Sequence, residues 1–489
     1  MTFFGLAHLD LFLWPFVGRR DAARTLALGV ILLSIAILLA LGSLTSSVLA
    51  LTAAVLGIAT LIRPALGLAI LGIAIPFGSL QEIALGSASI GAAEGLTAWV
   101  LLAWVARAVA YRQIPSMRRR YWIPVTLWLG AALLSVTGAV SWSHSLKELG
   151  KWMEFAGLIV CTTTLAGERE RSWIVVASLV GSIAAALLGW YQFFFRVGPE
   201  GFVLFGRFMR AYGTFRQPNP YAGYLGLMLP VGLSIVIGCW PRTGSPLRGL
   251  WLVACAAVGV IGPAIAMSWS RGSWFGVAAG ALVVLLGRGR RFALSVVLVV
   301  VALAGLAFVA GADLQIPPAF STRLTDFTEY FTWGDVSNIK PNPANFAVVE
   351  RQAHWQAAVR MFADRPWLGV GIGNYEAVYD MYRAPRWTDP LGHAHNYYLN
   401  VAAESGVIGL AAYVTFWTTI VVISWRCVRS EGGARRAVAL GILGAIVHLS
   451  VHNFFDDLFV QGIYLQVALW IGIVFSMTRL NGGDARCDF

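Results

Sequence analysis

The chain has 489 residues, of which 58% are hydrophobic and only 12% are charged, and its formal net charge is +12. A soluble domain has roughly 45–50% apolar and about 25% charged residues. So few charges cannot cover a soluble protein of this length. The composition therefore excludes a disordered chain, a nucleic-acid-binding tail protein and most soluble enzymes, and it predicts a polytopic membrane protein.

Apolar runs bounded by charge, proline or glycine predict an all-α fold of membrane-spanning helices. About 20 apolar residues cross a bilayer as a helix, and backbone polar groups in lipid must be paired, which a helix achieves. Several runs are short, so the expected count is 12–14. The runs are 25–43, 46–62, 64–80, 93–111, 122–140, 148–166, 172–195, 219–240, 249–269, 273–287, 292–311, 396–425, 437–453 and 458–478.

The start of the chain and its cysteines add two expectations. Residues 1–24 lack the basic region that opens a cleavable signal peptide, so we predict an interfacial segment there. The five cysteines show no paired spacing, which indicates neither a disulfide framework nor a zinc site.

Basic loops predict the orientation. Arginines gather in the loops on one side of the predicted spans, which the positive-inside rule assigns to the cytoplasm together with both termini. The loop of residues 312–395 lies on the other side and is far longer than a connection requires. The expected parts are N-terminal transmembrane helices (1–195), transmembrane helices with arginine-bearing outer loops (196–311), a large, partly helical periplasmic loop (312–395), and C-terminal transmembrane helices with a cytoplasmic tail (396–489).

Two outer segments carry arginines where few are expected. Loop 196–218 contains Arg210 and Arg216, which either bind a substrate or hold the loop. Arg271 stands in Ser268–Trp274, between two predicted spans. An arginine at the edge of the hydrocarbon is costly and usually functional, although it can also snorkel among tryptophans. Small residues on both sides of Arg271 allow close approach, so we expect a functional role.

The long loop contains a predicted amphipathic helix over residues 344–362. Val348, Trp355 and Val359 recur at helical spacing, with charged residues between them. Such a helix can lie on the outer membrane surface and roof a cavity. His354 falls on this helix, and we expect it to be an exposed surface residue.

Histidines mark the place where the long loop re-enters the membrane. His393 and His395 precede Asn396 and the next predicted span. A histidine at the outer mouth of a span can titrate near neutral pH and act as a base. A His-x-His pair can also bind a metal, but no third ligand of suitable spacing follows, so no metal is expected.

Paired acids, Asp456 and Asp457, end the penultimate span. They suit metal binding, orientation of a basic partner or simply a capped turn, and we assign them no role. The outer side thus combines arginines, histidines and few acids, which suits a diphosphate leaving group and a hydroxyl nucleophile. The chain has no Walker-type loop, so ATP is not expected as the energy source.

These residues resemble the bacterial O-antigen ligases and the related O-antigen polymerases. The ligase motif is His, then Asn, Ser or Gln, nine residues, Gly, two residues and Gly, and His395-Asn396 with Gly406 and Gly409 fits it in full. Further similar segments are Thr214–Asn219, Ser270–Trp274 and a pattern from Arg351 through Trp355 to Asp364–Gly371. The resemblance covers about residues 205–460.

The resemblance implies a metal-independent, inverting membrane glycosyltransferase without a cofactor. It implies a polyprenyl (undecaprenyl) diphosphate-linked glycan as donor, a glycolipid or glycan acceptor such as lipid A core, and a site on the periplasmic side of the inner membrane. His395 matches the catalytic histidine, and Arg271 and Arg351 match the essential arginines. Arg210, Arg216, His393 and Asn396 are expected to bind substrate. Membrane lipid is an expected partner, and nucleic acid is not.

Three other functions remain open at this point. A polymerase and a protein O-oligosaccharyltransferase use the same donor, and the motifs do not distinguish their acceptors. A transporter of a small anion such as bicarbonate belongs to a different class. It is disfavoured because a transporter is expected to carry its ionisable residues near the bilayer midplane, whereas here they lie at the outer mouth.

Overall fold

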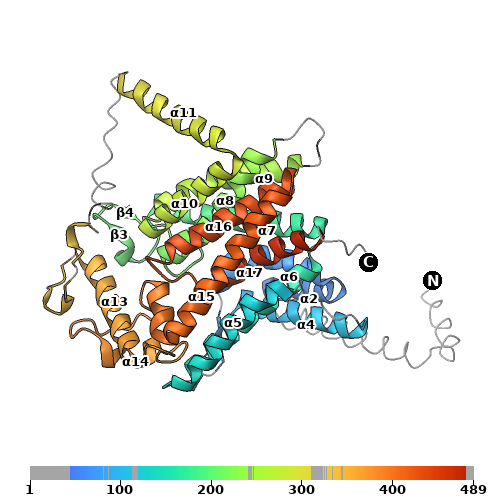
Figure 1. The fold of residues 1–489 in the computed structure, drawn as a ribbon. Coiled ribbons are helices and arrows are strands. Elements are labelled where there is room, and N and C mark those ends of the chain that lie inside the picture. The colour runs from blue at the N-terminus through green and yellow to red at the C-terminus, as the bar shows by residue number, and fades with distance from the viewer. Residues whose placement is uncertain are drawn as a thin grey trace, which may run out of the picture. The chain divides into compact units, whose positions relative to one another are not determined.

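The computed structural model describes residues 44–480, apart from 81, 86–87, 113–118, 241–244, 246, 310–322, 324, 326–327, 333 and 343–344. The described chain is almost entirely helical, which confirms the predicted all-α polytopic class (Figure 1). The predicted interfacial segment and the predicted span 25–43 lie outside the described residues. The described residues fall into two compact units, one containing α2 (Leu44–Ile62) and the other beginning at Pro64.

Within the described residues, seven helices are long and apolar enough to cross a membrane. They are α4 (Ala92–Ala110), α5 (Arg119–Ser135) with the 3-10 turn that follows it, α7 (Glu168–Phe195), α8 (Pro218–Gly238), α9 (Arg248–Met267), α15 (Tyr397–Ser430) and α16 (Gly433–His452). The remaining helices at predicted spans of the second unit are α3 (Pro64–Ala74), α6 (Trp142–Leu165), α10 (Arg271–Arg288), α11 (Arg290–Val309) and α17 (Ile463–Leu480).

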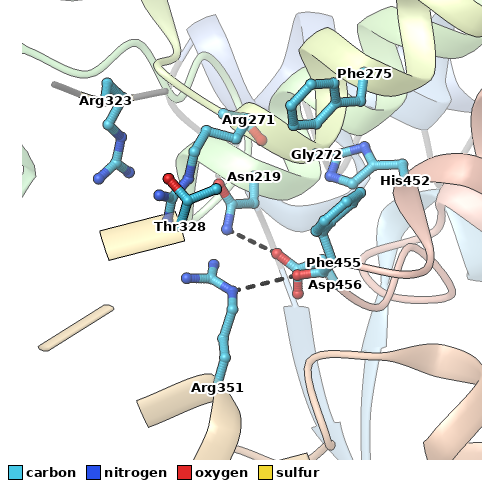
Figure 2. A pocket seen from close by; sticks show the side chains of 11 residues that line it. Asn219, Arg271, Gly272, Phe275, Arg323, Thr328, Arg351, His452, Phe455 and Asp456 are labelled. Atoms are coloured by element: carbon cyan, nitrogen blue, oxygen red, sulfur yellow. Dashed lines mark hydrogen bonds between the residues drawn. The ribbon is translucent and has the colours of Figure 1, made fainter. Parts of the chain in front are cut away.

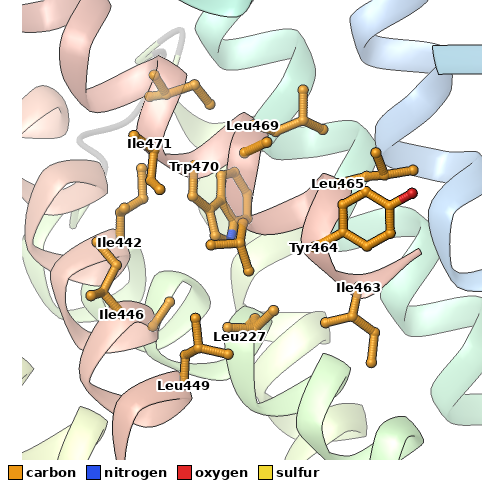
Figure 3. Close-up of a cluster of buried hydrophobic side chains, with 14 of the residues drawn as sticks. Leu227, Ile442, Ile446, Leu449, Ile463, Tyr464, Leu465, Leu469, Trp470 and Ile471 are labelled. Atoms are coloured by element: carbon orange, nitrogen blue, oxygen red, sulfur yellow. The ribbon is translucent and has the colours of Figure 1, made fainter. Parts of the chain in front are cut away.

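Small residues and a buried apolar layer hold α8, α10, α16 and α17 together. A Cβ added to Gly280 of α10 would lie 2.6 Å from the carbonyl oxygen of Gly444 on α16, so these two backbones touch. Small residues at such crossings are typical of helix packing in membranes. Beside this crossing, Leu227, Ile446 and Trp470 are fully buried in a cluster shared by α8, α16 and α17 (Figure 3). This packing fixes the ends of α8, α10 and α16 relative to one another.

The connections between helices contain two short hairpins that hydropathy did not predict. Strands β1 (Glu82–Leu85) and β2 (Ala88–Gly91) pair antiparallel between α3 and α4, and β3 (Val203–Leu204) pairs with β4 (Phe208–Met209) after α7. The long loop contains α13 (Phe346–Asp364), close to the predicted helix, and α14 (Tyr375–Tyr382).

The predicted apolar face of α13 is partly wrong. Val348 is buried as expected, but the side chain of Val359 is 51% exposed. The buried face instead includes Gln352 and His354. Gln352 is accommodated because its side chain donates to the carbonyl oxygen of Thr332 at 2.5 Å.

Gly406 breaks α15 and anchors the long loop. Its φ of +64° and ψ of −166° interrupt the helix. The segment after α13 lies in this break, where Val370 N–H donates to the Ala403 carbonyl at 2.9 Å and Val407 N–H donates to the Pro366 carbonyl at 2.8 Å. A Cβ at Gly406 would lie 2.3 Å from the carbonyl carbon of Trp367, so only glycine fits. The break therefore ties the loop to the helix that follows His395.

Candidate active site

The described residues line a pocket of about 130 Å³ where α8, α10 and α13 meet the turn after α16 (Figure 2). Three arginines and one acid supply its charge. Asn219, Ser270 and Thr328 add neutral polar groups, and Phe275 and Phe455 add apolar surface. The lining residues are Asn219, Ser270, Arg271, Gly272, Phe275, Arg323, Thr328, Arg351, His452, Phe455 and Asp456.

Two of the predicted catalytic residues, Arg271 and Arg351, come together here from segments far apart in the sequence. Arg351 is fixed by hydrogen bonds from Nε to the Phe455 carbonyl at 3.3 Å and from Nη1 to the Ala347 carbonyl at 2.8 Å. Sequence reasoning missed a third lining arginine, Arg323. Burial and, to a lesser extent, the charge of Arg351 lower the pKa of Arg323 to about 10.

Arg210 is not one of the described lining residues, but it contacts Asn219, which is. Its Nε donates to the Ser268 carbonyl and its Nη2 to Asn219 Oδ1, both at 2.9 Å. Burial, followed by repulsion from Arg323 and Arg351, lowers the pKa of Arg210 to about 9. These guanidinium groups repel one another, and an anion that enters the pocket offsets this repulsion. The pocket therefore favours a negatively charged ligand.

The structure does not bring Arg216 to the pocket. Its guanidinium forms an ion pair of 2.8 Å with Glu82, and the Arg216 side chain is 61% exposed. Glu82 belongs to the β1–β2 hairpin, which sequence reasoning did not predict.

His395 lies against Asp456 beside the pocket. His395 Nδ1 is 3.1 Å from Asp456 Oδ1. Burial and, to a lesser extent, the charge of His393 lower the pKa of His395 to about 4, although the hydrogen bond to Asp456 acts in the opposite direction. At pH 7 His395 is therefore neutral, with its proton on Nδ1 facing the carboxylate. Nε2 is buried without a hydrogen-bond partner among the described residues, so its lone pair is available as a base.

Asp456 is the one acid among the described lining residues. Burial by itself raises the pKa of Asp456. The hydrogen bond from His395, together with nearby positive charge such as that of Arg351, outweighs that effect and holds the pKa below its ordinary value. An ionised Asp456 can therefore orient His395 and stabilise the imidazolium form that proton uptake creates.

The other two predicted substrate-binding residues have structural partners. The Asn396 side chain accepts hydrogen bonds from the backbone N–H groups of Tyr398 and Leu399, both at 3.1 Å, and so caps α15. His393 Nδ1 accepts from the backbone N–H of His395 at 3.1 Å. Both residues thus help to place His395, which has a positive φ of 51°.

The expectation that no third ligand accompanies the His-x-His pair is wrong. Asp456 Oδ1 lies 4.0 Å from His393 Nε2 and 3.1 Å from His395 Nδ1, so three ligand-type residues meet. Sequence spacing could not show this, because 61 positions separate His395 from Asp456. The expected metal independence does not depend on spacing alone, and it stays a prediction.

The prediction that His354 is exposed is also wrong, since only 1% of its surface is accessible. His354 Nδ1 is 3.0 Å from the Tyr375 hydroxyl. Its ring stacks on Tyr379 with centroids 4.9 Å apart, and it meets the His395 ring edge-on at 5.6 Å. Burial lowers the pKa of His354 to about 3, with a smaller contribution from His395. His354 is therefore a neutral packing partner of the proposed base.

The fold and the pocket define a multi-pass, all-α membrane protein with an arginine-lined site next to an Asp–His pair. Residues 256–414 match the family model described as O-antigen ligase, and the chain gives no significant match to any curated protein. The matched stretch is therefore similar to the O-antigen ligases, a family of enzymes of the ligase or glycosyltransferase type. The matched stretch includes Arg271, Arg351 and His395, whereas Asn219 and Asp456 lie outside it.

Proposed function

We propose that this protein is an inverting glycosyltransferase of the O-antigen ligase type, which transfers a glycan from polyprenyl diphosphate to an acceptor hydroxyl at the periplasmic face. One observation carries the proposal. Arg271, Arg323 and Arg351 face one pocket, and the Asp456–His395 pair stands at its side.

The arginines suit the donor. When the bond between C1 of the glycan and the phosphate oxygen breaks, negative charge develops on the diphosphate. Arg271 and Arg351 stabilise that charge through charge-assisted hydrogen bonds. The diphosphate leaves on its polyprenyl carrier, and Phe275, whose side chain is 47% exposed, offers apolar surface beside the arginines.

The Asp–His pair suits the acceptor. The acceptor oxygen attacks C1 on the face opposite the diphosphate, which inverts that centre. Its proton moves to His395 Nε2, and Asp456 stabilises the imidazolium through Nδ1. One bond forms at C1 as the bond to the diphosphate breaks, so the reaction is complete without a metal, an oxidant or a nucleotide.

We propose lipid A core or another cell-surface glycan as the acceptor. Polymerisation of lipid-linked glycans and transfer to a protein hydroxyl remain alternatives, because they use the same donor chemistry. Anion transport is disfavoured, since the pocket arginines come from the ends of helices and from loops and not from the middle of spans.

The proposed side of the membrane predicts opposite labelling of two exposed positions. In a variant without native cysteines, Lys340→Cys lies in the long loop and Arg169→Cys lies in the first turn of α7, next to the short connection from α6. An impermeant thiol reagent should label position 340 in cells with a permeabilised outer membrane, and position 169 only after the inner membrane is broken. Equal labelling of both positions in cells with a permeabilised outer membrane and an intact inner membrane would contradict the proposed orientation.

Glycan transfer should survive removal of divalent metal ions. The mechanism needs Asp456 as a partner of His395, and a metal bound between them would remove the base. Purified protein treated with EDTA and then dialysed should therefore transfer at its original rate. An absolute requirement for a divalent ion, restored by adding it back, would instead assign His393, His395 and Asp456 to a metal site.

A further inference from the structure

Asn219 joins the arginine side of the pocket to the Asp–His pair. Its Oδ1 accepts a hydrogen bond from Arg210 Nη2 at 2.9 Å. Its Nδ2 donates to Asp456 Oδ2 at 2.7 Å, a contact that Figure 2 shows as a dashed line. The other carboxylate oxygen, Asp456 Oδ1, faces His395 Nδ1 at 3.1 Å. An unbroken series of hydrogen bonds therefore runs from Arg210 through Asn219 and Asp456 to His395.

The chemistry of this position requires an amide. Arg210 offers only donors and the Asp456 carboxylate only acceptors, so the residue between them must accept on one side and donate on the other. Asparagine does both with one planar group. An aspartate at this position could accept from Arg210 but would set a second carboxylate against Asp456, and a leucine would leave both charged groups without this partner.

The Asp456 carboxylate is consequently held from both sides. Oδ1 also accepts from the backbone N–H of Asp457 at 3.0 Å, while Oδ2 is held by Asn219. This arrangement fixes the rotation of the carboxylate and keeps Oδ1 directed at Nδ1 of His395. The proton of the neutral imidazole then stays on Nδ1. Nε2 keeps its lone pair, which takes up the proton of the acceptor hydroxyl.

We propose that Asn219 is a positioning residue, which acts on the reaction through Asp456 by keeping the carboxylate aligned with His395. This inference rests on the proposed function, because it presupposes His395 as the base. Asn219 begins the membrane helix α8, and Arg210 lies in the preceding loop. The inference assigns Arg210 an indirect role, as the group that orients the Asn219 amide.

A double-mutant cycle tests this inference. Asn219→Leu should lower kcat about 10²-fold, the order of loss that follows a small misplacement of catalytic groups, and the KM for donor should stay near wild type. Asn219→Asp keeps the shape of the side chain and should be impaired to a similar degree. In an Asp456→Ala background, Asn219→Leu should cause no further loss, because residues that act as one unit are not additive.

Asn345→Ala is the matched control. Asn345 is a buried asparagine whose side chain bonds to loop backbone at Asn342 and Lys340, away from the described lining of the pocket. The kcat of Asn345→Ala should remain at the wild-type value. The melting temperature of each Asn219 variant should be compared with that of Asn345→Ala, so that a loss of folding is recognised as such.

The same set of variants tests the proposed function and the positioning role of Asn219 separately. Transfer by wild type and its loss in His395→Ala test the proposed function. Two results would then overturn the positioning role alone. One is a loss of kcat in the Asn219→Leu/Asp456→Ala double variant that equals the product of the losses in the two single variants. The other is a wild-type kcat in Asn219→Asp. Loss of donor affinity without loss of kcat in Asn219→Leu would do the same.

Discussion

Replacing His395 with alanine should abolish glycan transfer and leave donor binding nearly intact. The base acts on the acceptor proton, whereas the arginines hold the diphosphate, so the two functions lie on different residues. A positioned base contributes typically 10²–10⁴-fold, and a loss of this order is expected. The measurement is transfer from a synthetic polyprenyl-diphosphate sugar in detergent, alongside donor binding to the same preparation.

The rate of the wild-type enzyme should also follow the pKa of His395. Because that pKa is lowered to about 4, the imidazole stays neutral well below pH 6.5. Transfer should therefore hold from pH 7 to about 5 and fall as the pH approaches 4, where Nε2 becomes protonated. His144→Ala, at an exposed position, is the control and should transfer like wild type. Substantial transfer by His395→Ala at neutral pH would remove this histidine from the mechanism.

Arg271→Ala and Arg351→Ala should weaken donor binding as well as turnover. Each removes a hydrogen bond between charged groups worth about 1.5–3 kcal/mol, which corresponds to roughly 10–150-fold in affinity. Lysine at either position should restore only part of the loss, because it offers a point charge in place of a planar fork. Donor dissociation constants and kcat for the four variants provide the measurement.

Arg360→Ala is the matched control for these arginines. Arg360 lies on α13 like Arg351, but its exposed guanidinium bonds to the Tyr382 carbonyl and lies 3.7 Å from Asp335. Its donor affinity should equal that of wild type. Wild-type donor affinity in both Arg271→Ala and Arg351→Ala would show that the diphosphate binds elsewhere.

Much of the helical architecture could be predicted from hydropathy because it follows from local composition. The expected span 219–240 is α8, Pro218–Gly238, and the expected span 273–287 lies within α10, Arg271–Arg288. Gly406 could be recognised as a motif residue, but its role as a break in α15 could not. That role depends on the loop that passes through the break, which lies about 40 residues earlier in the chain.

The site was predictable only where one residue carried a signal alone. Arg271 and His395 stood out because charge at the mouth of a membrane span is rare. Asp456 stood out only as one of two paired acids, and its role could not be assigned because its partner lies 61 positions away. Asn219 is a common polar residue at a helix start, and only the contacts with Arg210 and Asp456 distinguish it.

The errors on α13 also have a physical cause. A periodic pattern predicts one buried face, on the assumption that a helix packs on one side only. Here α13 packs against α14 and α15 and also against the segment near Val336, so a wider face is buried. His354 and Gln352 are therefore enclosed with hydrogen-bond partners, which no pattern in the helix itself could indicate.

The most direct measurement follows both products of the proposed reaction. Purified wild-type protein is incubated with a synthetic polyprenyl-diphosphate oligosaccharide, with and without a hydroxyl acceptor such as lipid A core. The account predicts free polyprenyl diphosphate and a new glycosidic bond of inverted configuration in equal amounts, both dependent on the acceptor. An intact donor after incubation with lipid A core, glycan and protein acceptors in turn would contradict it, as would a product of retained configuration.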